Sequence, residues 1–301
     1  MSRLLRPGAL GPALAQRALH ALACGAMHPI ETREEIVHQA GVDFIVRRVS
    51  SLERKEDAKT RNEGAARPAD PFLPHEPDLF VADVSDTHFA LLNKFNVIER
   101  HLLIVTRAFV HQETLLDAAD FEALAACMAE VDGLAFYNGG SAAGASQMHK
   151  HLQLVPLPLI TGGPDVPVEP LFAAADADAG QGMLRIPGFP FRHAFAWLQA
   201  GMFGAPEAAA AHLSRLYRDM LAAVGLAPAP QAGARQAGPY NLLATRRWML
   251  LVPRSREMFD SVSVNSLGYA GSMFVRDESQ MQVLRRGGPM AVLRETAIAL
   301  A

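Results

Sequence analysis

The chain has 301 residues, of which 50% are hydrophobic and 20% are charged, enough apolar material for a large folded unit and too much for a disordered chain. The chain has 28 lysines and arginines and 31 aspartates and glutamates, so its net charge is -3. This charge excludes a general nucleic-acid coat and a polybasic membrane binder. The two cysteines lie outside any zinc-binding spacing and cannot form a disulfide framework, so a reducing, cytoplasmic location is expected.

The N-terminal segment predicts an amphipathic helix. Its early arginines and many alanines resemble a targeting peptide, but prolines interrupt it before an apolar region forms. Leu14, Ala18 and Leu22, joined by Leu19, would lie on one helical face. No stretch reaches the roughly 18 apolar residues that span a bilayer, so no membrane partner is expected.

Four segments are irregular by composition. Residues 53–70 are polar and charged and predict a loop, and residues 71–77 contain three prolines that favour an extended path. Residues 156–190 are rich in Pro, Gly and Asp, and residues 226–239 have the composition of a linker.

Ordered elements lie between these segments. Strands are predicted at 88–98 and 101–106, joined by a turn at Glu99 and Arg100. A helix follows, with Asp117 or Asp120 as its N-cap and Gly133 just beyond its end. Two further strands are predicted at 135–137 and 148–155.

The C-terminal part continues this mixture. Residues 192–199 and 207–224 predict helices, and residues 240–252 and 261–264 predict strands. Asp277 can cap a helix that runs to Leu284, and Pro289 can start a final helix. Strands in hairpin order, without regular strand–helix–strand units, indicate an α+β fold.

The most informative segment is FYNGGSAAGASQMHKHLQ, residues 136–153. Because side chains alternate along a strand, His149, His151 and Gln153 would share one face, which is not a core pattern. The other face would carry Met148, Leu152 and Leu154, with Lys150 as a polar exception.

The glycine-rich loop before the histidines leaves its backbone N–H groups unshielded, so it could approach phosphate oxygens closely. It contains G-x-x-x-x-G from Gly139 to Gly144, but Ala145 stands where a Walker motif needs lysine. The loop is therefore not a Walker loop.

Three uses of the histidine pair remain open from the residues alone. They could bind a metal, although no nearby carboxylate offers a third ligand. Both rings could be structural and satisfied by hydrogen bonds. One imidazole could attack phosphorus while the loop holds the phosphates, and this is the hypothesis we favour.

Four segments closely resemble the ATP adenylyltransferase family, the diadenosine tetraphosphate phosphorylases. They are LLNKFNVIERHLLIVTRAFVHQETLL, LAFYNGGSAAGASQMHKHLQLVPLP, YNLLATRRWMLLVPRS and SVNSLGYAGSMFVR. This family lies in the histidine-triad superfamily, which also holds galactose-1-phosphate uridylyltransferase. The resemblance runs from about residue 25 to the C-terminus, and Met148 replaces the family's usual proline.

The fold that this resemblance implies is a histidine-triad-like antiparallel sheet with flanking helices. Residues 1–301 would form one elaborated unit. Residues 70–225 would be its catalytic core, and the conserved region at 236–301 would pack against it.

The activity that it implies is phosphorolysis of diadenosine tetraphosphate to ATP and ADP. His151 would attack the α-phosphorus to form an adenylyl-histidine, and inorganic phosphate would accept the adenylyl group. Superfamily hydrolases have a third histidine at the position of Gln153. Because glutamine cannot shuttle a proton, Gln153 favours transfer over hydrolysis.

The resemblance also implies the substrate contacts. They are Lys55, Asn93, Lys94, Asn138, Gly144, Ala145, Ser146, Gln147, His149, Gln153, Asn265, Ser266, Leu267, Ser272 and Arg276. His149 would orient the site, and the backbone N–H groups of residues 144–147 would face the phosphates. At positions 272 and 276 the family commonly has methionine and lysine.

No covalent cofactor and no protein-bound metal are expected, although Mg²⁺ could arrive with the polyphosphate. The partners would be small nucleotides, and the sequence leaves the oligomeric state open. The same histidine chemistry also serves adenylyl sulfate phosphorolysis and uridylyl transfer. An alternative of another class is a nucleotide-binding sensor with little turnover.

Overall fold

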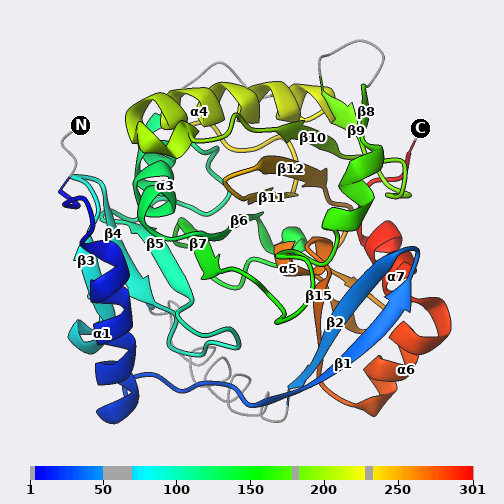
Figure 1. Cartoon of the computed structure of the whole chain (residues 1–301), viewed down its shortest axis with the longest axis horizontal. Coiled ribbons are helices and arrows are strands. Elements are labelled where there is room, and N and C mark those ends of the chain that lie inside the picture. The colour runs from blue at the N-terminus through cyan, green and yellow to red at the C-terminus, as the bar shows by residue number, and fades with distance from the viewer. Residues whose placement is uncertain (1–3, 50–69, 178–182, 228–232, 301) are drawn as a thin grey trace.

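A ten-stranded sheet forms the centre of the computed structural model, which describes residues 4–49, 70–177, 183–227 and 233–300 (Figure 1). The strand order is β3-β4-β5-β7-β6-β11-β12-β10-β9-β8, and every described pairing in this sheet is antiparallel. The strands are β3 (Phe80–Asp83), β4 (His88–Leu92), β5 (Leu102–Thr106), β6 (Gly133–Gly139), β7 (His151–Pro156), β8 (Asp176–Ala177), β9 (Leu184–Arg185), β10 (Ala194–Trp197), β11 (Tyr240–Ala244) and β12 (Trp248–Pro253).

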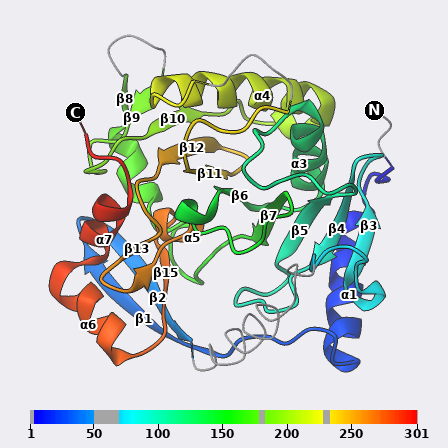
Figure 2. The same ribbon diagram turned by 180° about the vertical axis from the view of Figure 1, so that it is seen from behind.

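Three helices pack on one face of the sheet. They are α1 (Leu10–Ala23), α3 (Ala118–Glu130) and α4 (Pro206–Ala223). Their buried side chains, such as Leu14, Phe121 and Leu213, form one core with alternate strand residues such as Leu152 and Leu242. Figures 1 and 2 show α3 and α4 together along one side of the sheet and α1 beside β3.

The other face carries a smaller layer. A three-stranded sheet joins the antiparallel hairpin β1 (Thr32–Gln39) and β2 (Val42–Val49) to the parallel strand β15 (Ser272–Val275). The helices here are α5 (Ser266–Tyr269), α6 (Glu278–Gly287) and α7 (Pro289–Thr296), and β13 (Met258–Phe259) pairs with β14 (Val262–Ser263). Phe44, Leu243, Leu250 and Leu293 belong to the core of this layer.

Short 3-10 turns connect these elements. They are η1 (Pro77–Leu79), η2 (Ser141–Ala143), η3 (Glu169–Ala174) and η4 (Met202–Gly204). None of the helices in the described ranges is long and apolar enough to cross a membrane.

The predicted α+β class is confirmed, and so are three helix ends. Asp117 caps α3 and forms a reciprocal capping box with Asp120, Asp277 caps α6, and Pro289 starts α7. Gly133 lies beyond the end of α3 as predicted, but it is not the C′ glycine of that helix, because the C-cap is Val131. Gly133 is the first residue of β6, where an added Cβ would lie 2.5 Å from the carbonyl oxygen of Val155.

Several predicted boundaries differ from the structure. Residues 192–199 contain strand β10 rather than a helix, because Ala194 and Phe195 are buried against cores on opposite faces of the sheet. Residues 240–252 form the hairpin β11–β12, and the strand predicted at 88–98 ends at Leu92. The predicted strand 148–155 begins only at His151. Strands β1, β2 and β3 were not predicted.

The buried face of α1 also differs from the prediction. Leu10, Leu14, Ala18 and Ala21 are buried, whereas Leu19 and Leu22, which were predicted on the same face, are exposed. The polar loop predicted at 53–70 lies outside the described residues apart from Asp70.

Strands from the two parts of the proposed unit share one sheet. β11 of the C-terminal region pairs with β6 of the proposed catalytic core, residue by residue from Tyr240 opposite Gly139 to Ala244 opposite Ala135. The exact domain bounds stay a prediction.

Candidate active site

His151 begins the central strand β7 and lies on the face opposite α3 and α4. It is paired with Val105 of β5, and Gln153 lies between Leu103 and Phe136 on the same face. The predicted alternation is therefore correct for His151 and Gln153. The ring of Phe72 covers His151, with 5.1 Å between the ring centroids.

The ring of His151 has a defined tautomer. Its Nδ1 lies 2.8 Å from the carbonyl oxygen of His149, and a carbonyl oxygen can only accept, so Nδ1 carries the hydrogen. Burial lowers the pKa of His151 to about 4, so the ring is neutral near pH 7. Nε2 then holds a free lone pair, and it has no hydrogen-bond partner within the described part of the chain.

The backbone of His151 is held by the buried side chain of Gln112. Its Oε1 accepts from the N–H of His151 at 2.9 Å, and its Nε2 donates to the carbonyls of Asn138 at 3.0 Å and His151 at 3.3 Å. Gln112 thus fixes the start of β7 relative to the end of β6. No local sequence pattern indicates Gln112, because its partners lie 26 and 39 residues away.

His149 is engaged with the protein on both ring nitrogens. Nδ1 lies 2.8 Å from the Asp70 carboxylate, and Nε2 lies 2.9 Å from both the hydroxyl and the carbonyl oxygen of Thr106. This geometry agrees with an orienting role. It leaves no free nitrogen for a metal, so a metal site through both histidines does not fit.

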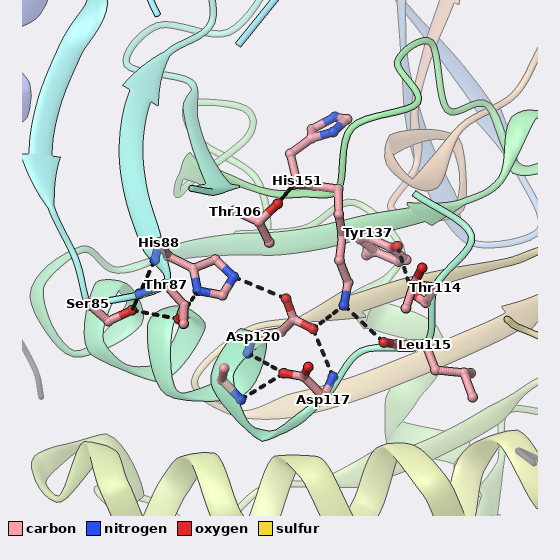
Figure 3. Close-up of polar contacts among 12 residues, drawn as sticks. Ser85, Thr87, His88, Thr106, Thr114, Leu115, Asp117, Asp120, Tyr137 and His151 are labelled. Carbon is pink, nitrogen blue, oxygen red and sulfur yellow. Dashed lines mark hydrogen bonds and ion pairs between the residues drawn. The ribbon is translucent and has the colours of Figure 1, made fainter. Parts of the chain in front are cut away.

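Lys150 lies on the opposite face and is buried, contrary to a simple alternation of apolar and polar residues. Its ammonium group donates to Asp120 and, at 2.9 Å, to the carbonyl of Leu115. His88 contacts the other oxygen of Asp120 at 3.1 Å. In Figure 3 the ring of His151 points away from this cluster.

The carboxylate of Asp120 is ionised in this cluster. Burial alone would raise its pKa, but the hydrogen bond from His88 and the charge of Lys150 lower it below the usual value. The ion pair anchors the residue immediately before His151 to the N-terminal turn of α3.

The glycine loop folds on itself, and this limits its phosphate donors. The N–H of Gly144 donates to Ser141 at 2.8 Å, and that of Ala145 donates to Gly140 at 3.1 Å. These two predicted donors are therefore not free for a phosphate. Ser146 and Gln147 donate no hydrogen bond to the described chain, so their N–H groups and side chains are available.

Gly144 is required by both conformation and contact. Its φ is +87°, in the left-handed region that favours glycine. An added Cβ would lie 2.8 Å from Cβ of Asn265 and 2.9 Å from the carbonyl oxygen of Val264. The loop thus packs directly on the segment that precedes α5.

Asn138 joins β6 to α5. Its Oδ1 accepts from Nδ2 of Asn241 at 2.9 Å, from the N–H of Ser266 at 2.9 Å and from the hydroxyl of Ser266 at 2.8 Å. The buried guanidinium of Arg254 donates to Oδ1 of Asn241 at 2.6 Å, which fixes the orientation of that amide. The Nδ2 group of Asn138 is left as a donor.

Asn265 and Leu267 are also used locally. The side chain of Asn265 is the N-cap of α5 and accepts from the N–H of Leu267 at 3.0 Å. Asn265 lies beside Gly144, and the contact of Asn265 and Leu267 with substrate stays a prediction.

Asn93 and Gln153 are connected through His101. Nδ2 of Asn93 lies 3.1 Å from Nδ1 of His101, and Nε2 of His101 lies 2.9 Å from Oε1 of Gln153. His101 was predicted only as the first residue of a strand. Its place in the sequence could have indicated a role in the site, because it lies eight residues after Asn93 within a segment that carries the family resemblance.

The remaining predicted contacts bond elsewhere. Lys94 pairs with Glu76 at 2.6 Å, and Ser272 accepts from Arg47 at 2.5 Å. Arg276 is exposed at the end of β15, and its N–H donates to Gln280. Lys55 lies outside the described residues. The roles of these four residues stay predictions.

Among the described residues, no group of three possible metal ligands lies at this site. The group of possible ligands found in the described ranges is His20 on α1, Cys24 just after α1 and Asp78 on η1, with ligand atoms within 4.8 Å of one another. Asp70 and Asp120, the carboxylates that contact His149 and Lys150, are already paired.

Family models match most of the chain. Residues 1–174 match the Ap4A phosphorylase N-terminal domain, and residues 187–299 match the ATP adenylyltransferase C-terminal domain.

Individual proteins match over most of their length. The chain is 27% identical over 281 residues to diadenosine tetraphosphate phosphorylase 2 of Saccharomyces cerevisiae, which covers 82% of this chain and 80% of that protein. It is 25% identical over 276 residues to the protein APA1 of the same yeast, with the same coverage.

Solved structures show the same fold. The crystal structure of yeast Ap4A phosphorylase Apa2 matches with a TM-score of 0.78 at 22% identity, over 98% of this chain and 96% of that chain. The structure of Apa2 in complex with Ap4A matches with a TM-score of 0.76 at 21% identity, over 98% and 99% of the two chains.

Proposed function

The chain belongs to the Ap4A phosphorylase family, and from this premise we propose that it transfers an adenylyl group from diadenosine tetraphosphate to inorganic phosphate. The net reaction converts these substrates to ATP and ADP. The observation that carries the proposal is the free Nε2 of a neutral, buried His151, beside a folded glycine loop.

In the first step, Nε2 of His151 attacks the α-phosphorus. An N–P bond forms, the bond from that phosphorus to its bridging oxygen breaks, and ATP leaves with the electron pair. The ring becomes positively charged, and the carbonyl of His149, which accepts from Nδ1, stabilises that charge. In the second step, a phosphate oxygen attacks the same phosphorus, the N–P bond breaks with its electron pair returning to Nε2, ADP leaves, and neutral His151 is restored.

Donors around the phosphates would stabilise the charge on the transferred group. The available ones are the N–H groups and side chains of Ser146 and Gln147, together with the amide nitrogens of Asn138 and Gln153. The amides of Asn138 and Gln153 are oriented by the hydrogen bonds that their oxygens accept before substrate binds, so these two donors need little reorganisation during transfer.

The proposed reaction needs no strong acid. The leaving polyphosphate has a low proton affinity, so it departs without protonation. Gln153 occupies the third position of the motif, and an amide cannot activate water by taking its proton. These features support transfer to phosphate over hydrolysis.

The proposed reaction uses no covalent cofactor. Mg²⁺ would arrive with the substrate's phosphates and reduce their charge, because the carboxylates that contact the motif are already paired. We further propose a cytoplasmic location and small nucleotides as the partners of the chain. Cys24 and Cys127 are free, as a reducing compartment would keep them.

The test supplies diadenosine tetraphosphate with and without inorganic phosphate and separates the products. Phosphate-dependent formation of equal amounts of ATP and ADP supports the proposal. ATP and AMP formed without phosphate would identify a hydrolase. No cleavage, with binding retained, would favour a sensor, and parallel assays with adenylyl sulfate would identify that alternative donor.

A further inference from the structure

Three side chains form a hydrogen-bonded chain that ends at the third position of the motif. Asn93 and His101 lie at the two ends of the connection between β4 and β5, and Gln153 lies on β7. The backbone N–H of Asn93 donates to the carbonyl of His101 at 2.9 Å, so the two residues are also fixed by their backbones.

The direction of each hydrogen bond in this chain is determined. Oδ1 of Asn93 accepts from the N–H of Phe95 at 3.1 Å, so Nδ2 of Asn93 faces His101. An amide nitrogen only donates, and Nδ1 of His101 must therefore accept. In the neutral ring the hydrogen is then on Nε2, which donates to Oε1 of Gln153 at 2.9 Å.

This arrangement fixes which end of the Gln153 amide is available. With Oε1 bound to His101, the Nε2 group of Gln153 is left to donate, and it has no acceptor within the described part of the chain. A flipped amide would place its NH₂ against the N–H of His101. It would also turn its oxygen toward negatively charged phosphates, so the flipped state is disfavoured at both ends.

We propose that His101 is a positioning residue for adenylyl transfer, which keeps the NH₂ of Gln153 directed at the transferred phosphate. This inference rests on the proposed function, because it assigns a purpose to the orientation of Gln153. His101 does not touch the reacting atoms. It acts through Gln153, and Asn93 acts through His101.

The packing around His101 supports a fixed ring. Its side chain is buried, and its ring lies 5.7 Å from that of Phe136, the residue opposite Gln153 on β6. The ring therefore cannot turn freely, and the hydrogen on Nε2 keeps its direction.

A double-mutant cycle between His101→Phe and Gln153→Ala tests the coupling. Gln153→Ala removes the donor and should lower kcat by about a hundredfold, whereas His101→Phe leaves the amide free to flip and should lower kcat about tenfold. KM should change little in either variant. In the Gln153→Ala background, His101→Phe should have almost no further effect on kcat.

If the reductions of kcat from His101→Phe and Gln153→Ala multiply in the double variant, the proposal is overturned. A purely structural role of His101 would persist without Gln153. His193→Phe is the matched control. His193 is as buried as His101, at 7% exposure, and both of its ring nitrogens bond to the protein backbone, at Phe191 and Ile186. This control should lower stability and leave kcat unchanged.

A measurement without turnover separates this inference from the proposed function. Nitrogen-15 NMR of the histidine rings should find His101 neutral with its hydrogen on Nε2. A hydrogen on Nδ1 would contradict the proposal even in an active enzyme. If the wild-type protein fails to phosphorolyse diadenosine tetraphosphate, the proposed function fails, and the tautomer still tests the orientation of Gln153.

Discussion

Nδ1 of His151 donates to the carbonyl oxygen of His149 at 2.8 Å, which leaves Nε2 as the nucleophilic atom. The hydrogen bond joins the two histidines of the motif through the backbone of one and the ring of the other. Because the partner is a carbonyl rather than a carboxylate, it fixes the tautomer without raising the basicity of the ring strongly.

The first prediction concerns pH. Burial lowers the pKa of His151 to about 4, so the nucleophile stays neutral from pH 8 down to about pH 5. The rate constant for single-turnover cleavage of diadenosine tetraphosphate, measured without inorganic phosphate at low substrate concentration, should stay level over this range and fall only as the pH approaches 4. A fall centred near pH 6.5 would show that His151 titrates as an exposed histidine.

The second prediction concerns Gln112. Gln112→Ala removes the hydrogen bonds to both backbone groups of His151 and to the carbonyl of Asn138. We expect a loss of about 2–3 kcal/mol in the free energy of unfolding, from several unpaired buried groups, together with a kcat lowered at least about tenfold. Denaturant unfolding and steady-state kinetics measure both quantities.

Gln236→Ala is the control for Gln112. The partly buried side chain of Gln236 donates one hydrogen bond, to the carbonyl of Gly139 at 2.7 Å, and none to His151 among the described contacts. Gln236→Ala should lower the free energy of unfolding by about 1 kcal/mol or less and change kcat little. Equal effects on kcat in the two variants would refute a specific role of Gln112 in placing His151.

The third prediction concerns the glycine loop. Gly144→Ala requires a left-handed alanine and also places Cβ 2.8 Å from Cβ of Asn265. Gly162→Ala matches the conformation, with φ +82°, but has no neighbour within 4 Å. Gly162→Ala should lower the free energy of unfolding by about 1–2 kcal/mol. Gly144→Ala should lower it by more and should also lower the activity. Equal costs would mean that the loop does not pack on Asn265 as described.

The fourth prediction concerns the buried ion pair behind His151. Asp120→Asn leaves the ammonium group of Lys150 buried without its carboxylate, which should cost about 3–5 kcal/mol. Replacing both residues, with Lys150→Met and Asp120→Asn, should recover part of that loss. Thermal unfolding of the wild type, Asp120→Asn and the double variant tests this, and a double variant less stable than Asp120→Asn alone would contradict the account.

The sequence predicted the motif face well because a strand has a period of two. His151 and Gln153 lie on one face, and the apolar residues Leu152 and Leu154 lie on the other. Lys150 broke the pattern, since its burial depends on Asp120, which lies 30 residues earlier and on another element. A local pattern does not reveal such a distant charge partner.

The orientation of the predicted contacts could not be predicted either. Asn93, Asn138 and Ser266 were expected to contact substrate, yet each forms hydrogen bonds to groups brought together only by the folded sheet. Strand β10 was mistaken for a helix for a similar reason. β10 pairs with β12 on one side and with β9 on the other. This pairing in the sheet overrides the local helical preference of its residues.

The most direct test of the central claim is the mass of the protein after reaction with diadenosine tetraphosphate in the absence of inorganic phosphate. The wild-type chain should gain one acid-labile adenylyl group on His151 and release it as ADP when phosphate is added. His151→Asn should gain none and should lose at least about a thousandfold in turnover. An adenylyl group on another residue, or undiminished turnover in His151→Asn, would contradict the account.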